Sequence, residues 1–295
     1  MRILHSLVIT PGLCGLYETA KEFIKAEEKL GHEVYVREPD DSSQNMKDSE
    51  IVKYSEGVDV DVIIDHSGCD KYLLGLGIPI IHIRHGRPLS SFLIENEGGI
   101  KIYSHLKNIG KDPRYVAVVT LWKEHVPFWE NLMGRDIDYI PCPVDLDHYC
   151  PGGPKHNFGG KAHSGYNIVC ADMWRHDECP FEALNLLLQR PNKNYKLHVY
   201  GIQTKLTTAQ QALLSCFGDR LGEVGWSKDM APIYRAADEV ITGATINTRV
   251  VREALACGCK ILGRLPPREY AMTHFDANIS AKKLISIAER SLNGC

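Results

Sequence analysis

The sequence predicts an α/β protein made of two Rossmann-like, doubly wound domains that face each other across a cleft. Segments typical of strands and of helices alternate along the 295 residues, and this alternation stops once and then restarts. The segments 60–64 and 78–83 are apolar throughout, as strands buried inside a parallel sheet are. The interruption falls at 150–165, which is rich in glycine and proline and which we interpret as a linker. We therefore expect one domain at 1–148 and another at 149–295.

The first half opens with a strand-helix-strand unit. A strand is expected at 2–9, and Gly31 ends the helix before a second strand at 32–36. The helix carries its apolar residues on one face, at Ala20, Phe23, Ile24 and Leu30. The polar segment 39–57 is expected to be a surface loop with a short helix. Further strands are expected at 60–64, 78–83, 115–121 and 138–140, with a helix at 123–133.

The second half repeats the alternation after the glycine-rich segment. Strands are expected at 167–171, 196–200, 222–225, 239–242 and 260–262. Helices are expected at 180–189, 207–217, 229–236, 249–257 and 280–292. We assign the last of these helices, like the others, to the second domain.

The composition excludes several classes of protein. A content of 44% hydrophobic and 24% charged residues is ordinary for a soluble globular protein. No apolar run approaches the ~18 residues of a membrane span, and the opening segment is too short for a secretory signal. The ten cysteines are scattered without a Cys-x-x-Cys pair, which indicates reduced thiols in the cytoplasm rather than a metal cage.

The charge is distributed unevenly between the two halves. Residues 1–143 hold 16 Lys and Arg against 22 Asp and Glu, whereas residues 144–295 hold 18 against 15. The weakly basic second half suits a ligand that carries phosphate. The acidic first half argues against broad adhesion to nucleic acid or to anionic membranes.

A candidate phosphate site lies at the start of the helix expected at 249–257. Thr245, Asn247 and Thr248 precede this helix and can cap it, while its free N–H groups and its dipole attract an anion. Glu253 lies about one turn further along, where its carboxylate can accept hydrogen bonds from the hydroxyls of an attached sugar. The pattern therefore suits a nucleoside diphosphate.

The same residues also allow a purely structural interpretation. Arg249 and Glu253 are four positions apart, so an ion pair along the helix accounts for both without a ligand. Helix capping alone accounts for the threonines. Trp226 and Met230, in the preceding segment, suit either the wall of a base-binding pocket or the hydrophobic core.

The first half offers candidates at the ends of its strands. Gly12 and Gly15 follow the first strand, where they can let the backbone approach a ligand or simply form a turn. His66 and His85 follow two buried strands, and His85 lies between Arg84 and Arg87. The positive neighbours favour a neutral His85 imidazole, which is our candidate for contacting the reacting sugar or the acceptor. The alternative is a strand-end histidine that binds the backbone.

Several segments resemble, in order, those of one enzyme family. They are GLYETAKEFIKAEEKLGHEVYV, IPIIHIRHG, IDYIPCPVDLDHYCPGG, VGWSKDMAPIYRAADEVIT and REALACGCKIL. Together they resemble the GT-B glycosyltransferases, in particular the retaining group numbered family four (glycosyl transferases group 1). The resemblance implies two Rossmann-like domains, a nucleotide-sugar donor, a reaction without a metal ion and retention of anomeric configuration.

The donor motifs depart from the pattern of that family. Its members carry two glutamates eight positions apart around a Gly-Phe-Gly turn; here Glu253 is the second, and Thr245 replaces the first. Residues 246–248 replace the turn itself. A Gly-Arg pair followed by a lysine is replaced by the segment 171–175, in which Arg175 alone matches a residue that grips the diphosphate.

We therefore expect a cytoplasmic glycosyltransferase that transfers a sugar from a nucleoside-diphosphate sugar to an acceptor hydroxyl. No cofactor or metal is expected, and the nucleotide sugar is a co-substrate. The acceptor is left open among a saccharide, a small molecule and a hydroxymethylated base of phage-type DNA. Two other functions suit the same fold: a nucleotide-sugar 2-epimerase and a non-catalytic nucleotide-sugar sensor.

Overall fold

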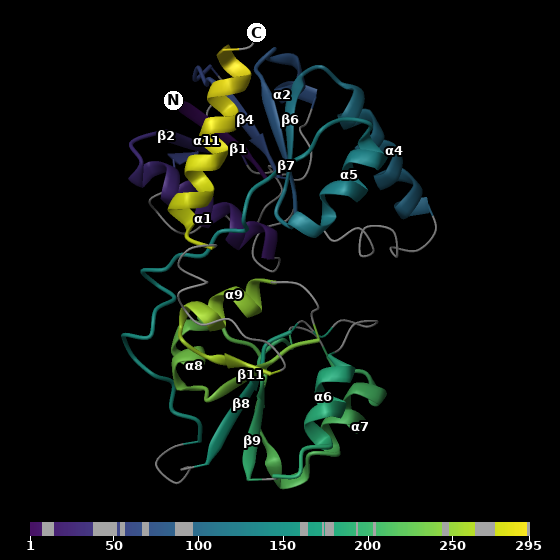
Figure 1. Cartoon of the computed structure of the whole chain (residues 1–295), viewed down its shortest axis with the longest axis vertical. Coiled ribbons are helices and arrows are strands. Elements are labelled where there is room, and N and C mark those ends of the chain that lie inside the picture. The colour runs from purple at the N-terminus through teal and green to yellow at the C-terminus, as the bar shows by residue number, and fades with distance from the viewer. Residues whose placement is uncertain are drawn as a thin grey trace. The chain divides into compact units, whose positions relative to one another are not determined.

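The chain forms two compact units (Figure 1). The first contains Met1–Pro143 and Ala277–Cys295, and the second contains Val144–Asp276. The computed structural model describes residues 1–7, 15–37, 52–53, 57–66, 71–85, 97–159, 165–172, 174, 180–192, 194–202, 205–243, 248–262 and 275–293.

A parallel seven-stranded sheet forms the centre of the first unit. Its order is β3-β2-β1-β4-β5-β6-β7, with parallel pairing throughout. The strands are β1 (Arg2–Ser6), β2 (Glu33–Arg37), β3 (Val52–Lys53), β4 (Val62–Asp65), β5 (Ile80–Arg84), β6 (Tyr115–Thr120) and β7 (Asp138–Tyr139). The chain runs outward in one direction from β1 to β3 and in the other from β4 to β7. This places the topological switch point, where such sheets bind ligands, between β1 and β4.

Both faces of this sheet are buried, which explains why its strands are apolar throughout. Alternate residues of a strand point to opposite faces. Ile3 and Ile64 pack with α1 (Gly15–Lys29) and α11 (Ala277–Asn293), whereas Leu4 and Ile63 pack on the other face with Trp129. The helices of that other face are α2 (Lys71–Gly75), α4 (Glu97–Lys111) and α5 (Val126–Met133), the last preceded by the 3₁₀ turn η1 (Lys123–His125).

A parallel five-stranded sheet forms the centre of the second unit. Its order, β10-β9-β8-β11-β12, repeats the order β3-β2-β1-β4-β5 of the other sheet. The strands are β8 (Tyr166–Cys170), β9 (Tyr195–Val199), β10 (Leu221–Val224), β11 (Glu239–Ile241) and β12 (Lys260–Ile261). The helices are α6 (Phe181–Leu188), α7 (Thr208–Ser215), η2 (Gly218–Arg220), α8 (Ala231–Ala236) and α9 (Arg249–Ala256). The prediction of two Rossmann-like domains is confirmed.

The terminal helix α11 packs in the first unit. From the sequence we had expected it in the second domain. It lies beside α1, and Figure 1 shows the two helices together. Ala26, Ala277 and Ala281 form their contact, and such small side chains allow two helices to approach closely. The first unit is therefore discontinuous in sequence, and its boundary with the second falls at 143/144 rather than at 148/149.

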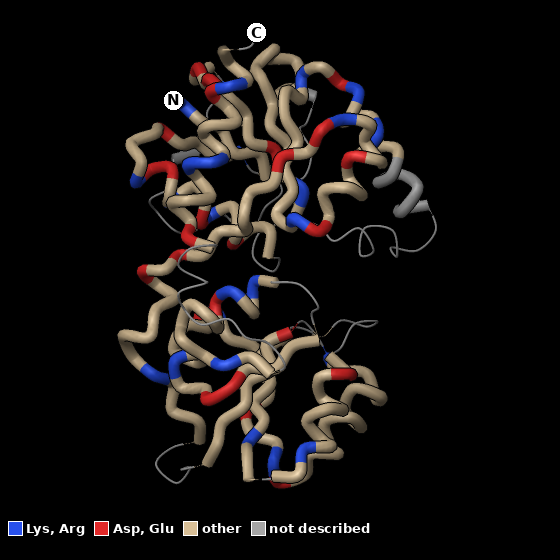
Figure 2. The backbone as a smooth tube through the Cα atoms, viewed as in Figure 1, with Lys and Arg blue, Asp and Glu red and all other residues tan. Residues whose placement is uncertain are grey.

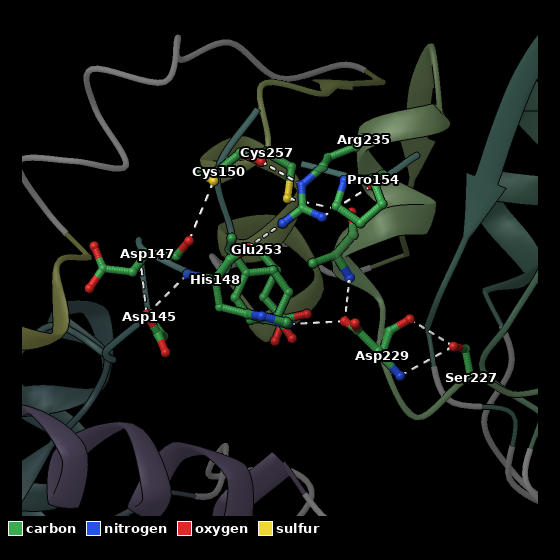
Figure 3. Close-up of polar contacts among 12 residues, drawn as sticks. Asp145, Asp147, His148, Cys150, Pro154, Ser227, Asp229, Arg235, Glu253 and Cys257 are labelled. Carbon is green, nitrogen blue, oxygen red and sulfur yellow. Dashed lines mark hydrogen bonds and ion pairs between the residues drawn. The ribbon is translucent and has the colours of Figure 1, made fainter. Parts of the chain in front are cut away.

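The glycine-rich segment that we expected to be a linker is instead part of the second unit. Arg235, on α8, donates hydrogen bonds to the backbone carbonyls of His148, Cys150 and Pro154 (Figure 3). One planar guanidinium thereby binds three backbone carbonyls at the start of this segment and just before it. Glycine and proline content indicates turns, but it does not show which side chain will bind them.

The division into units reduces the charge asymmetry. With α11 included, the first unit holds 19 Lys and Arg against 23 Asp and Glu, and the second holds 15 against 14. Figure 2 shows that both signs are interspersed along each unit. Among the helices that the model describes, none has the length and apolar composition needed to cross a bilayer.

Most predicted elements are present within a few residues of their expected bounds, whereas α2, α4 and β3 were missed. Helix α4 begins with Glu97-Gly98-Gly99, and glycine is a poor helix former. Most of the loop expected at 39–57 lies outside the described residues.

Candidate functional site

The carboxyl ends of the strands in the second sheet bring together four segments of the chain. The residues that follow β8, β9, β10 and β11 include Asp172, Gly201, Trp226 and Gly243. In parallel α/β sheets this edge carries the ligand site, at the point where the strand order reverses. Here that point lies between β8 and β11, which are neighbours in the sheet.

Asp172 bridges the two strands that flank this switch point. Its carboxylate accepts hydrogen bonds from Thr242 Oγ1 at 2.7 and 2.9 Å and from the backbone N–H of Gly243 at 2.6 Å. These two donors, the Thr242 hydroxyl shared between both carboxylate oxygens and the Gly243 N–H, fix the loop after β8 to the loop after β11. The aspartate that stands near the expected diphosphate-binding position therefore has a structural role in this edge.

Gly201 lies where the loops after β8 and β9 approach each other closely. A Cβ atom at this position would overlap the backbone oxygen of Asp172 and lie 2.5 Å from its carbonyl carbon. The carbonyl of Gly201 also accepts a hydrogen bond from the N–H of Trp174 at 3.1 Å. Only glycine fits here without a movement of the backbone.

Helix α9 begins at the same edge of the sheet. Its N-cap is Thr248, whose side chain makes no capping hydrogen bond, and Thr248 Oγ1 is buried without a hydrogen-bond partner among the described residues. The capping role predicted for this threonine is therefore not seen. Thr245 and Asn247, predicted beside it, lie outside the described residues.

Arg249 and Glu253 form the ion pair that the sequence offered as the structural alternative. Arg249 Nε contacts Glu253 Oε1, and Glu253 is only 3% exposed. The hydroxyl of Tyr149 lies 3.5 Å from Arg249 Nη2. Burial raises the pKa of Glu253, while the charges of Arg249 and Arg252 and the hydroxyl of Tyr149 act to lower it. The ribose contact of Glu253 stays a prediction.

Trp226 and Met230 differ in their surroundings. Trp226 is 48% exposed and forms an isolated bridge with Gly201, so it presents a large aromatic surface at the carboxyl edge. Met230 is half-buried and packs against the core of the second unit. Trp226 therefore remains available to stack on a base, whereas packing accounts for Met230.

A polar cluster beside this edge was not foreseen from the sequence. His148 Nε2 and Asp229 Oδ1 lie 3.0 Å apart, and Asp229 Oδ1 also accepts from the N–H of Ala231 at the start of α8 (Figure 3). Asp145 accepts hydrogen bonds from the N–H groups of Asp147 and His148. These bonds fix the segment that enters the second unit, and no periodic pattern in the sequence marks them.

In the first unit, the carboxyl edge brings two predicted histidines into contact. His66 Nδ1 and His85 Nε2 are 2.7 Å apart. Two further members of this group were not predicted from the sequence. His5 Nδ1 lies 2.8 Å from His66 Nε2, and His5 Nε2 lies 2.7 Å from Glu27 Oε2. Glu27 could have been found, because it lies three positions after Ile24 and four after Phe23, on the apolar stripe of α1.

His66 is held neutral in this group. It is 2% exposed, and burial lowers the pKa of His66 well below its usual value, with further lowering by His85, His5 and His82. Burial also lowers the pKa of Arg84 to about 10, so this arginine stays charged near neutral pH. Its guanidinium lies over the ring of Trp129, 4.8 Å from the centroid.

The neutral, buried His66 predicts a pH-dependent stability. Below pH ~6.5 the unfolded chain takes up a proton on this histidine that the folded chain does not, so stability falls as the pH falls. The loss has a limiting slope of about 1.4 kcal/mol per pH unit for one proton. Urea unfolding of wild type and His66→Asn between pH 7.5 and 5 measures it. The variant should show the smaller slope; equal slopes would contradict the assignment.

The other predicted site residues are placed less fully. Gly15 is the first residue of α1, and a Cβ atom there would meet nothing within 4 Å in the described part of the chain. Close packing therefore does not require a glycine at this position. Gly12, Arg87 and Arg175 lie outside the described residues.

Neither the described surface hollows nor a cluster of metal-ligating side chains adds a candidate site to the two carboxyl edges. The two hollows found are lined by residues at the starts of β6 and of β8 and β9, at the amino edges of the sheets. Doubly wound folds bind their ligands at the opposite edge, so these hollows lie away from the expected sites. Within the described ranges, no three His, Cys, Asp or Glu side chains converge as metal ligands do.

The comparisons with known proteins identify the fold. No family model matches the sequence, and no curated protein matches it either. A glycosyltransferase from Rickettsia africae ESF-5 is similar in structure, with a TM-score of 0.71 and 12% identity over 100% of this chain and 99% of that one. Anabaena Alr3699/HepE, solved with UDP-glucose, has a TM-score of 0.63 and 11% identity over 100% and 99%.

A third similar structure is an alpha-glucosyltransferase in complex with UDP and a 13-mer DNA containing an HMU base. Its TM-score is 0.62, with 11% identity over 98% of this chain and 99% of that one. The similarity extends over nearly the whole of both chains in each comparison, so it includes both units. The protein therefore has the GT-B fold, with two Rossmann-like domains.

Proposed function

We propose that the protein is a glycosyltransferase that moves a sugar from a nucleoside-diphosphate sugar to an acceptor hydroxyl. The observation that carries this proposal is the similarity to glycosyltransferases over nearly the full length of both chains. Fold alone does not fix chemistry, so the residues at the carboxyl edge of the second sheet supply the further support. Those residues include an exposed aromatic side chain and the start of a helix.

In this proposal the second unit binds the donor. The base stacks on Trp226, and the diphosphate binds the N–H groups at the start of α9 together with Arg249. Arg175 is proposed to bind the same phosphates. Transfer develops negative charge on the departing diphosphate, which these cationic and N–H groups stabilise without a metal ion. We also propose, from the family resemblance, that the anomeric configuration is retained and that Glu253 contacts the ribose.

The acceptor binds the first unit in this proposal, and its class has two candidates. A saccharide or small-molecule hydroxyl is the first. A hydroxymethylated DNA base is the second, supported by the similar alpha-glucosyltransferase that was solved with such DNA. The excess of acidic residues in the first unit, 23 against 19 basic ones, weighs against a polyanion there. The six cysteines described are all free thiols, which suits the reducing cytoplasm that we propose.

A thermal-shift panel of UDP-, GDP-, ADP- and CDP-sugars tests donor binding. A ligand that binds only the folded state stabilises it by mass action and so raises Tm. At a ligand concentration of one hundred times Kd, the free energy of unfolding rises by about 2.7 kcal/mol. One nucleotide series should raise Tm for wild type and much less for Trp226→Ala. The matched control is Phe181→Ala, which also removes a half-exposed aromatic from the second unit. If no nucleotide shifts Tm, donor binding is excluded.

Product analysis separates the remaining functions. A transferase forms a glycosylated acceptor and frees the nucleoside diphosphate. A 2-epimerase would isomerise the sugar or release nucleotide without any acceptor. A sensor would bind the donor stoichiometrically and leave it intact in every acceptor screen, which would contradict the proposal.

A further inference from the structure

A continuous line of hydrogen-bonding side chains runs through the first unit. It starts at Glu27 on α1 and passes through His5 on β1 and His66 after β4 to His85 after β5. The three contacts measure 2.7, 2.8 and 2.7 Å. Glu27 and His5 are fully buried, His66 is nearly so, and His85 is half-buried. The line therefore connects the interior to the carboxyl edge of the sheet.

The carboxylate of Glu27 sets the direction of every bond in this line. An ionised carboxylate only accepts, so His5 donates from Nε2, and a neutral His5 then accepts at Nδ1. His66 must then donate from Nε2 and accept at Nδ1, and His85 must donate from Nε2. All three imidazoles are thus in the same tautomer, and Nδ1 of His85 is the basic atom at the outer end.

The arrangement is suited to moving protons rather than to holding a metal. Successive rings lie with their centroids 5.1 and 4.9 Å apart, so within the described part of the chain the ring nitrogens follow one another in a line and do not converge on a point. His66 in the middle is held neutral by burial, as a ring that both accepts and donates must be. Glu27 Oε2 is the atom that His5 contacts and would receive the proton, while Glu27 Oε1 is buried and accepts no hydrogen bond from the described residues.

We propose that Glu27, His5, His66 and His85 form a proton relay that takes up a proton at His85 and stores it on Glu27. A proton binds Nδ1 of His85; the proton on Nε2 of His85 moves to Nδ1 of His66, that on Nε2 of His66 moves to Nδ1 of His5, and that on Nε2 of His5 moves to Glu27. Each imidazole ends neutral in its other tautomer, and the carboxylate becomes a carboxylic acid. No charge is left on any ring.

The relay ends where the first sheet should bind its ligand. His5 and His66 belong to β1 and to the end of β4, the two strands that flank the topological switch point. This step rests on the proposed function: the relay removes the proton of an acceptor hydroxyl at His85. The O–H bond breaks as its oxygen bonds the anomeric carbon, and the carbon–oxygen bond to the diphosphate breaks with its electron pair leaving on the diphosphate. His85 is then catalytic, and the other three position and discharge it.

Other charged groups surround the relay and are part of its titration. Asp65 and His82 form a buried pair at 2.8 Å, and the charge of His82 acts on His66. Arg84 precedes His85 in the chain. The charges of His82, Asp65 and Arg84 act on the pKa of His105 on α4. A pH profile of the relay therefore reports this whole group rather than one histidine.

Nitrogen-15 NMR of the ring nitrogens tests the relay without any substrate. Variants His5→Asn, His66→Asn and His85→Asn assign the three signals among the 13 histidines. At pH 8 the wild type should show Nε2 protonated and Nδ1 unprotonated in all three rings. A mixture of tautomers, or a protonated Nδ1 in any of the three, would overturn the proposal. The wild-type spectrum decides this point even if a variant fails to fold.

The matched variants Glu27→Gln and Glu28→Gln then test the carboxylate. Glu28 is the exposed neighbour on the same helix, and its variant should keep the wild-type tautomers. An amide both donates and accepts, so in Glu27→Gln the hydrogen bonds of the line can run in either direction. This variant should therefore give mixed tautomers at His5 and His66. Unchanged tautomers in a folded Glu27→Gln protein would overturn the relay.

Turnover adds a second measurement once an acceptor is found. Glu27→Gln should lower kcat by at least tenfold with KM nearly unchanged and should alter the pH profile, whereas Glu28→Gln should match wild type. Wild-type kcat and pH profile in Glu27→Gln would overturn the relay in catalysis. Correct tautomers with no transfer to any acceptor would keep the relay and reject the proposed function instead.

Discussion

Glu253→Ala should lower the free energy of unfolding by about 3–5 kcal/mol, because it removes the buried carboxylate that offsets the charges of the part-buried Arg249 and the buried Arg252. Glu253 is 3% exposed and contacts Arg249, and Arg252 beside it is only 2% exposed. Urea unfolding of the purified variant measures the loss. A loss below about 1 kcal/mol would show that the ion pair contributes little to the fold.

The double variant Arg249→Ala/Glu253→Ala is the control for this prediction. It removes both charges, so it should be more stable than the sum of the two single changes implies. Glu253→Gln keeps the volume and serves the functional question. If Glu253 also contacts the ribose, calorimetry should show donor binding weakened by ~1–3 kcal/mol in a folded Glu253→Gln protein. Unchanged affinity would reject the ribose contact and leave the ion pair.

Gly201→Ala should lower the free energy of unfolding by about 3 kcal/mol or more, because its Cβ would overlap the backbone of Asp172. The overlapping atoms belong to a backbone, which cannot turn away as a flexible side chain can. Gly225→Ala is the matched control: it also follows a strand of the second sheet, and a Cβ there would meet nothing within 4 Å in the described part of the chain. The control should lie within about 1 kcal/mol of wild type.

The same change tests how tightly the carboxyl edge is built. Asp172 joins the loops after β8 and β11, so moving its backbone disturbs both. Donor binding should therefore weaken in Gly201→Ala even where the protein folds. A Gly201→Ala protein with wild-type stability and wild-type donor affinity would show that this close approach is not a constraint.

The fold could be predicted because the strands of a buried parallel sheet have a simple sequence pattern. The segments around Ile63 and Ile81 are apolar on both faces because helices cover both sides of the sheet. Which unit receives a helix is not recorded in the same way. Helix α11 has an amphipathic pattern like that of the other helices, and its place in the first unit depends on contacts with residues far away in the sequence, among them Ala26 with Ala281 and Leu284 with the core around Ile3.

Some residues of the candidate sites were predicted from the sequence and others were not, and the difference has a physical reason. His66 and His85 stood out because they follow apolar strands, where polar residues gather at the edge of a sheet. His5 and Glu27 lie inside the core, at positions where a pattern of buried and exposed residues leads one to expect apolar side chains. A buried polar residue is recognised only when its partner is known, and the partner of Glu27 lies 22 positions away.

The return of the chain to its first unit has a consequence for how the protein is made. Residues 144–276 form one continuous stretch, so their sheet can close without any later segment of the chain. The earlier sheet must wait, with one flank of β1 and β6 uncovered, until 277–293 arrive to shield it. A nascent chain halted before that last helix should expose apolar surface from residues translated first, and chaperones would find their binding sites there rather than in the segment made most recently.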